Sequence, residues 1–126
     1  MSRRLLLLPA LLATLLAGIL AAPVAGARHH KRPHVFIKVA DDYFSPAHLT
    51  RHRSVKVGTK VTWRWSTYNT NVHNVKLYRA PRHVKHFRTG FAGGGFRFSK
   101  ILRKRGLYRY RCQIHPGMRG VIRVKR

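Results

Sequence analysis

Acidic side chains are almost absent from this chain of 126 residues. It contains 2 acidic residues, the adjacent Asp41 and Asp42, against 27 lysines and arginines. Acid–base hydrolysis by two carboxylates on opposite sides of a bond needs a separated pair, so this composition nearly excludes that class of enzyme.

Sulfur is equally scarce. Cys112 is the single cysteine, and Met118 is the single methionine apart from Met1. One cysteine allows no disulfide within the chain, although small exported domains often depend on disulfides. Cys112 is therefore a buried passive thiol, one half of a bridge between chains, or a functional ligand.

Helical periodicity is also lacking, since no stretch of ten or more residues repeats apolar side chains at helical spacing. Apolar and aromatic residues instead alternate with polar ones, which is typical of half-buried antiparallel strands. The alternating runs are Val35–Val39, Val61–Ser66, Phe96–Ser99, Leu107–Cys112 and Ile122–Lys125. Turn-forming glycines and prolines separate these runs, and short strands at this spacing predict a β-sandwich or barrel.

Residues 1–27 are expected to form a cleaved signal peptide. Two arginines, a long apolar segment and the small residues Ala25-Gly26-Ala27 follow the order of such a peptide. An uncut membrane anchor is the alternative, but Pro9 and Pro23 interrupt the apolar run. We therefore expect an exported protein, in the periplasm or elsewhere in the cell envelope. It would have a basic, histidine-rich arm at 28–33, one domain at 34–126 and no transmembrane segment after cleavage.

The positive charge is extreme. Cleavage removes Arg3 and Arg4, which leaves 27 − 2 = 25 basic residues against 2 acidic ones, a formal charge of +23. The basic residues are interleaved with apolar ones, as expected for the solvent faces of strands. Such a chain attracts acidic proteins, anionic envelope surfaces and nucleic acid without sequence preference.

One short stretch, "YRYRCQIHPGMRG", gathers the scarce sulfur around a histidine. Cys112, His115 and Met118 are spaced so that one loop can supply a thiolate, an imidazole and a thioether, with Pro116-Gly117 turning the chain. His73 precedes another inward-patterned run and can supply a second imidazole. This soft donor set suits copper, and two histidines, a thiolate and a weak axial thioether form a type 1 copper arrangement. Zinc accepts the same donors and is the main rival.

Residues 34–126 resemble a small cupredoxin of the plastocyanin and amicyanin kind. The matching text runs "DDYFSPAHLT", "VGTKVTWRW", "HNV", "RTGFAGGGFRFSK", "GLYRYRCQIHPGM" and "GVIRV", in family order over nearly the whole mature chain. The resemblance implies an all-β, Greek-key β-sandwich or barrel of about seven to eight strands.

The resemblance also implies roles for single residues. His73, Cys112 and His115 would be the equatorial ligands of one type 1 copper ion, and Met118 would be the axial ligand. Asn74 stands at the position that braces the ligand loop by hydrogen bonding, and the ring edge of His115 would be the route by which electrons leave.

These features predict a monomeric one-electron carrier that cycles between Cu(II) and Cu(I), with a redox partner that is acidic or membrane-associated. An enzyme is not expected, because four protein donors leave no open position for a substrate. Two alternatives stay open: a copper carrier or sequestration protein without a dedicated redox partner, and a cationic module that binds polyanions around a structural metal. The new N-terminus, Arg28-His29-His30, is a further candidate site for Cu(II).

Overall fold

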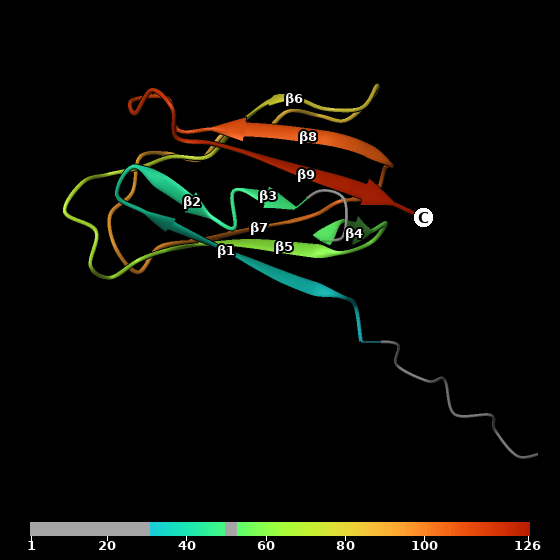
Figure 1. Ribbon diagram of the computed structural model, residues 1–126, viewed down its shortest axis with the longest axis horizontal. Helices are drawn as coiled ribbons and strands as arrows, with labels where there is room; N and C mark the ends of the chain where they lie inside the picture. Colours follow the sequence, from blue (N-terminus) through green and yellow to red (C-terminus); the bar gives the residue numbers. More distant parts are fainter. Residues whose placement is uncertain (1–30, 50–52) are drawn as a thin grey trace, which may run out of the picture.

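The computed structural model describes residues 31–49 and 53–126, which fold into two β-sheets packed face to face (Figure 1). No α-helix occurs among these residues. Two predictions concern residues outside the described part of the chain: the signal peptide at 1–27 and the candidate Cu(II) site at Arg28-His29-His30. Within the described part, no helix is long and apolar enough to cross a bilayer.

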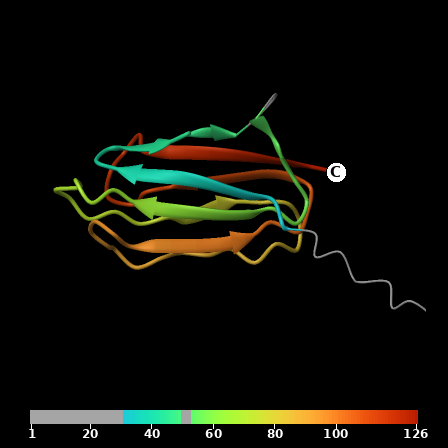
Figure 2. The same ribbon diagram turned by 90° about the horizontal axis from the view of Figure 1, so that it is seen from below.

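Within the described part of the chain, nine strands build the two sheets. The first sheet has the order β2-β1-β5-β7, formed by Tyr43–Ser45, His34–Ala40, Lys60–Trp65 and Arg97–Ile101. The second has the order β3-β9-β8-β6, formed by His48–Leu49, Arg119–Lys125, Gly106–Arg111 and Lys76–Arg79, and β4 (Val55–Lys56) also pairs with β9. The turned view shows β1, β5 and β7 side by side (Figure 2).

The predicted all-β sandwich is confirmed, with one correction to how its strands pair. The alternating runs were expected to pair antiparallel, but β1 lies parallel to β5, and β3 and β4 both lie parallel to β9. Alternation reports which face of a strand is buried and contains no information on the direction of its neighbour. The strand count exceeds seven to eight because β3 and β4, of two residues each, are too short to show a period.

The core fills the space between the sheets with the inward residues that alternation predicts. Trp63 and Tyr110 face one another across it, with ring centroids 5.3 Å apart and ring planes at 80°. Thr62 departs from the pattern, because it is buried although it belongs to the polar side of β5. Its hydroxyl lies 2.7 Å from both His34 Nε2 and Ser99 Oγ, so the two flanking strands cover it and pair its polar atom.

Candidate metal centre

Three of the four predicted donors converge at one end of the sandwich. The ligand atoms of His73, Cys112 and His115 all lie within 4.8 Å of one another. The two Nδ1 atoms are 3.0 Å apart, and Cys112 Sγ is 3.4 Å from His115 Nδ1. His73 and Cys112 are buried, whereas His115 is partly exposed. The site therefore opens to solvent on the side of His115.

The loop between β8 and β9, drawn in red at the left of Figure 1, supplies Cys112, His115 and Met118. Cys112 continues the inward face of β8, as its alternation predicted. The loop closes on itself, because Cys112 N donates to Met118 O at 3.0 Å and Met118 N donates to His115 O at 3.1 Å. Gly117 takes a φ of 93°, which glycine adopts without strain. These bonds hold the buried Met118 next to Cys112.

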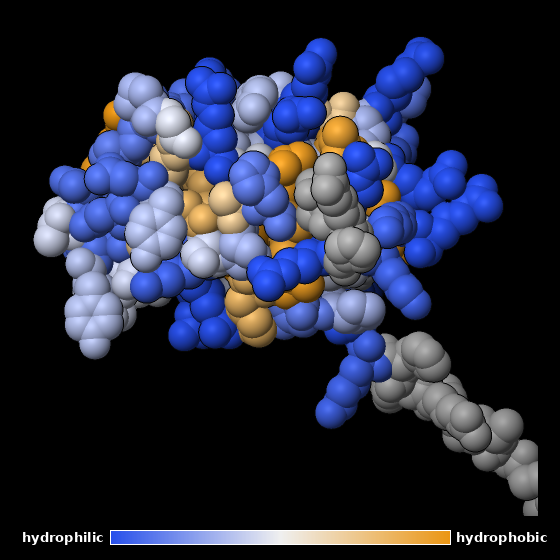
Figure 3. Space-filling view, viewed as in Figure 1, coloured by the Kyte–Doolittle hydropathy of each residue, from blue (hydrophilic) through white to orange (hydrophobic). Residues whose placement is uncertain are grey.

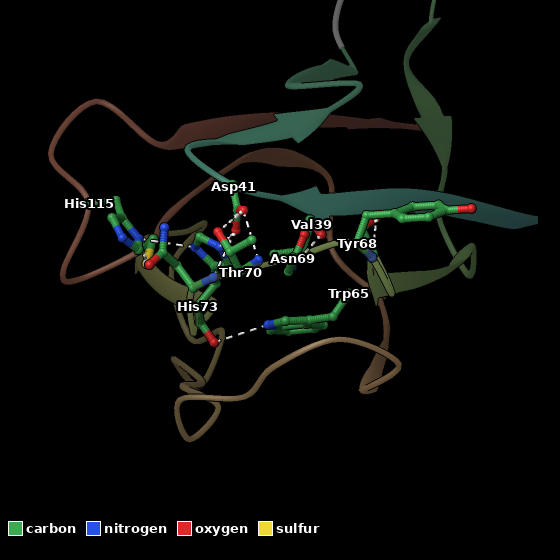
Figure 4. A network of polar contacts seen from close by, with 11 residues as sticks. Val39, Asp41, Trp65, Tyr68, Asn69, Thr70, His73 and His115 are labelled. Carbon is green, nitrogen blue, oxygen red and sulfur yellow. Dashed lines mark hydrogen bonds and ion pairs between the residues drawn. The ribbon is translucent and has the colours of Figure 1, made fainter.

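His73 comes from the segment that leads into β6, and its backbone is fixed on both sides. Its N–H donates to Ala92 O at 3.0 Å, and its carbonyl accepts from Ala92 N–H at 2.9 Å. The indole N–H of Trp65 also donates to His73 O, at 3.1 Å (Figure 4). The imidazole is thus held by a backbone that pairs with Ala92 in an isolated β-bridge.

Asn74 ties the two parts of the site together, as the resemblance implied. The N–H of Gln113 donates to Asn74 Oδ1 at 2.9 Å, and Asn74 Nδ2 donates to Gln113 Oε1 at 2.9 Å. Asn74 is buried, so its loss would leave polar groups of the loop unpaired.

Asp41 contacts the site too, and sequence reasoning missed this. It directly follows β1, and its Oδ1 lies 2.9 Å from His73 Nε2 (Figure 4). This bond to His73, together with those from Thr70, holds the pKa of the Asp41 carboxyl well below its usual range. The one available signal was its rarity, as one of 2 acidic residues in the chain.

The donors fit a copper ion. A buried cysteine sulfur and two Nδ1 atoms whose lone pairs can face a common point are soft and borderline ligands, which favour copper over magnesium, calcium or manganese. The family described as copper binding proteins, plastocyanin/azurin family, matches residues 37–125. The chain belongs to this family. As a cupredoxin, it has a copper site, and within residues 31–49 and 53–126 this is the cluster of His73, Cys112 and His115.

Solved structures agree with the family. A copper-containing nitrite reductase from Thermus scotoductus SA-01 matches with a TM-score of 0.63 and 26% identity over 80% of this chain. This chain spans only 24% of that protein's length. A reduced, Cu(I) form of an amicyanin variant matches with a TM-score of 0.61 and 25% identity, over 73% of this chain and 82% of that one. A search of the curated proteins found no match.

A purple cupredoxin from Nitrosopumilus maritimus shares the fold, with a TM-score of 0.59 and 24% identity, over 72% of this chain and 99% of that one. The fold of small cupredoxins thus accounts for the architecture of this chain. The roles of His73, Cys112 and His115 as equatorial ligands, and of Met118 as the axial ligand, stay predictions.

Proposed function

We propose that this cupredoxin transfers single electrons in the cell envelope. His73, Cys112 and His115 would hold copper in a near-trigonal set, with Met118 as a weak axial donor. A bound copper ion supplies one-electron redox chemistry, and the axial donor and the surroundings of the Cys112 sulfur tune its potential.

The observation that carries the proposal is the rigidity of the donors. The backbone of His73 is paired with Ala92, and the backbone of Cys112 with Met118, so each donor is fixed independently of the metal's charge. Asn74 joins the two segments through Gln113. Donor positions that are similar in both oxidation states keep the reorganisation on electron transfer small.

The partly exposed His115 would be the route by which electrons reach a partner. Three half-exposed apolar side chains adjoin the site: Val72 (48%) precedes His73 and Ile114 (47%) precedes His115. Phe91 (52%) precedes Ala92, whose backbone pairs with that of His73. Redox partners make small, short-lived contacts, for which such an apolar rim suffices. With a mature charge of 25 − 2 = +23, the partner is proposed to be acidic or to lie beside anionic membrane groups.

We further propose that the chain is a monomer and not an enzyme. Four protein donors would saturate the copper site and leave no position for a substrate. The similarity to the nitrite reductase covers 24% of that protein, so it supports a shared copper domain and not a shared activity.

The test is to add Cu(II) to the purified mature protein. We expect one equivalent to bind and to produce the intense blue absorption of a thiolate–Cu(II) bond, and the variant Cys112→Ser to bind without that colour. A colourless protein that prefers zinc would contradict the proposal.

Copper delivery is the second candidate, and the exposed histidines favour it, among them His48, His83 and His86. Rapid electron self-exchange with one copper bound supports the electron carrier. Several coppers bound, and passed readily to a chelating acceptor, would support the copper carrier instead.

A further inference from the structure

The imidazole of His73 uses both of its nitrogens. Nδ1 faces the donor cluster and lies 3.0 Å from His115 Nδ1, whereas Nε2 lies 2.9 Å from Asp41 Oδ1. The ring itself is fully buried, and 29% of the Asp41 side chain is exposed. Asp41 therefore approaches the ring from the side opposite to the metal position.

This arrangement determines where the proton of a neutral imidazole sits. An ionised carboxylate can only accept hydrogen bonds, so the nitrogen facing Asp41 must be the one that carries the proton. The lone pair then remains on Nδ1, which is the atom that faces Cys112 and His115. A carboxylate behind a ligand histidine fixes its tautomer and ring orientation and makes the ligand more basic.

Asp41 is itself held firmly. Its Oδ2 accepts from Thr70 N–H at 2.9 Å and from the Thr70 hydroxyl at 2.7 Å, and its Oδ1 accepts from Asn71 N–H at 3.2 Å. The neighbouring Asn69 donates from Nδ2 to Val39 O at 3.1 Å, which fastens the same loop to the end of β1 (Figure 4). One carboxylate thus orders both the loop that leads to His73 and the plane of its ring.

We propose that Asp41 is a positioning residue of the copper site, which fixes the Nε2–H tautomer of His73 and biases the bound metal toward Cu(II). The bias follows from charge, because a carboxylate behind the ligand stabilises a dication more than a monocation. The chain has 2 acidic residues in all, so this is a rare negative charge in a strongly positive molecule. The redox part rests on the proposed function, whereas the tautomer part does not.

The tautomer is tested on the metal-free, ¹⁵N-labelled mature chain by long-range ¹H–¹⁵N NMR at about pH 8, well above the ordinary imidazole pKa. We expect a proton on His73 Nε2 with a strongly shifted resonance. A bare Nε2 with the proton on Nδ1 would overturn the inference, and this measurement requires no substitution that could prevent folding.

The bias toward Cu(II) is tested by the reduction potentials of Asp41→Asn and Asp42→Asn. Asp42 is exposed and has a φ of 68°, which asparagine tolerates, so Asp42→Asn removes the same formal charge one residue away without strain. We expect Asp41→Asn to raise the equilibrium ratio of Cu(I) to Cu(II) at least tenfold over that of the wild type. For one electron, this is a reduction potential higher by about 59 mV. We expect Asp42→Asn to change this ratio less than about threefold.

Equal shifts of the reduction potential in the two variants would mean that Asp41 acts only through the net charge of the protein. This result would overturn the proposal. A wild-type protein that takes up no copper contradicts the proposed function, and the NMR result still decides the tautomer. If Asp41→Asn does not fold, Asp41→Ser replaces it because it also removes the carboxylate, and a reduction potential unchanged from the wild type would overturn the redox part of the proposal.

Discussion

Tyr108 shows how burial changes the chemistry of a single side chain. Its ring is buried, and its hydroxyl donates to Lys104 O at 2.8 Å. Burial raises the pKa of this phenol above its usual value, because the phenolate loses hydration in the core. The unfolded chain therefore releases this proton at a lower pH than the folded protein does.

Alkali should destabilise the fold partly through this residue. Above about pH 10, the ordinary phenol pKa, the unfolded state binds fewer protons, so the free energy of unfolding falls by up to about 1.4 kcal/mol per pH unit for one group. Tyr108→Phe should make this fall shallower, although it costs about 1 kcal/mol at neutral pH through the lost hydrogen bond. Urea unfolding from about pH 8 to pH 12 measures both effects. An identical slope in the two proteins would contradict the role of Tyr108.

At the scale of elements, the pairing of β8 with β9 positions the ligand loop. The two strands are in register from Gly106↔Val124 to Arg111↔Arg119, and the loop that joins them begins at Cys112. Tyr110 pairs with Gly120 directly beside this loop. A Cβ on Gly120 would lie 2.2 Å from Tyr110 Cζ, which real atoms do not tolerate.

Gly120→Ala should therefore be strongly destabilising. The Tyr110 ring cannot move aside easily, because it packs edge-on against Trp63 and Phe44, at centroid distances of 5.3 and 4.9 Å. We expect a loss of about 1–3 kcal/mol or more, together with a changed copper spectrum, since the loop begins two residues after Tyr110.

Gly93→Ala is the matched control, because a Cβ there meets nothing within 4 Å. It should change the free energy of unfolding by less than about 0.5 kcal/mol. Thermal or urea unfolding of the two variants measures the change in the free energy of unfolding. An equal loss at both positions would argue against the close contact with Tyr110.

At the scale of the whole molecule, the main feature of the surface is its positive charge. Strongly hydrophilic side chains project around the face seen in Figure 3, and apolar side chains occupy a smaller area between them. The formal charge of the 126 residues is +25. The electrostatic field of this charge extends over about one Debye length. That length shrinks from about 30 Å at 0.01 M salt to about 3 Å at 1 M.

Salt should change the reaction rates of the protein in opposite directions for reagents of opposite charge. We expect oxidation of the reduced protein by the anionic hexacyanoferrate(III) to slow by at least about tenfold as salt rises from about 0.01 M to 1 M. Oxidation by a cationic cobalt(III) phenanthroline complex should accelerate over the same range. Stopped-flow kinetics measure both, and rates that are insensitive to salt would show that the charge does not steer association.

The sequence by itself determined the donor types, the inward face of Cys112 and the all-β class. These properties are local: alternation identifies the buried face of a strand, and the scarcity of sulfur makes a loop with Cys112, His115 and Met118 informative. The family resemblance added Asn74 and the ligand roles, and the structure pairs Asn74 with Gln113.

Only the tertiary structure decided which distant side chains meet. Asp41 and His73 are 32 positions apart, and they touch because β1 ends beside the loop that leads into the copper site. Thr62 is buried for a similar reason, since His34 and Ser99 reach it from both neighbouring strands. The sequence period fixes which way a side chain points, but its partners depend on how strands are ordered and directed, and no local pattern contains that information.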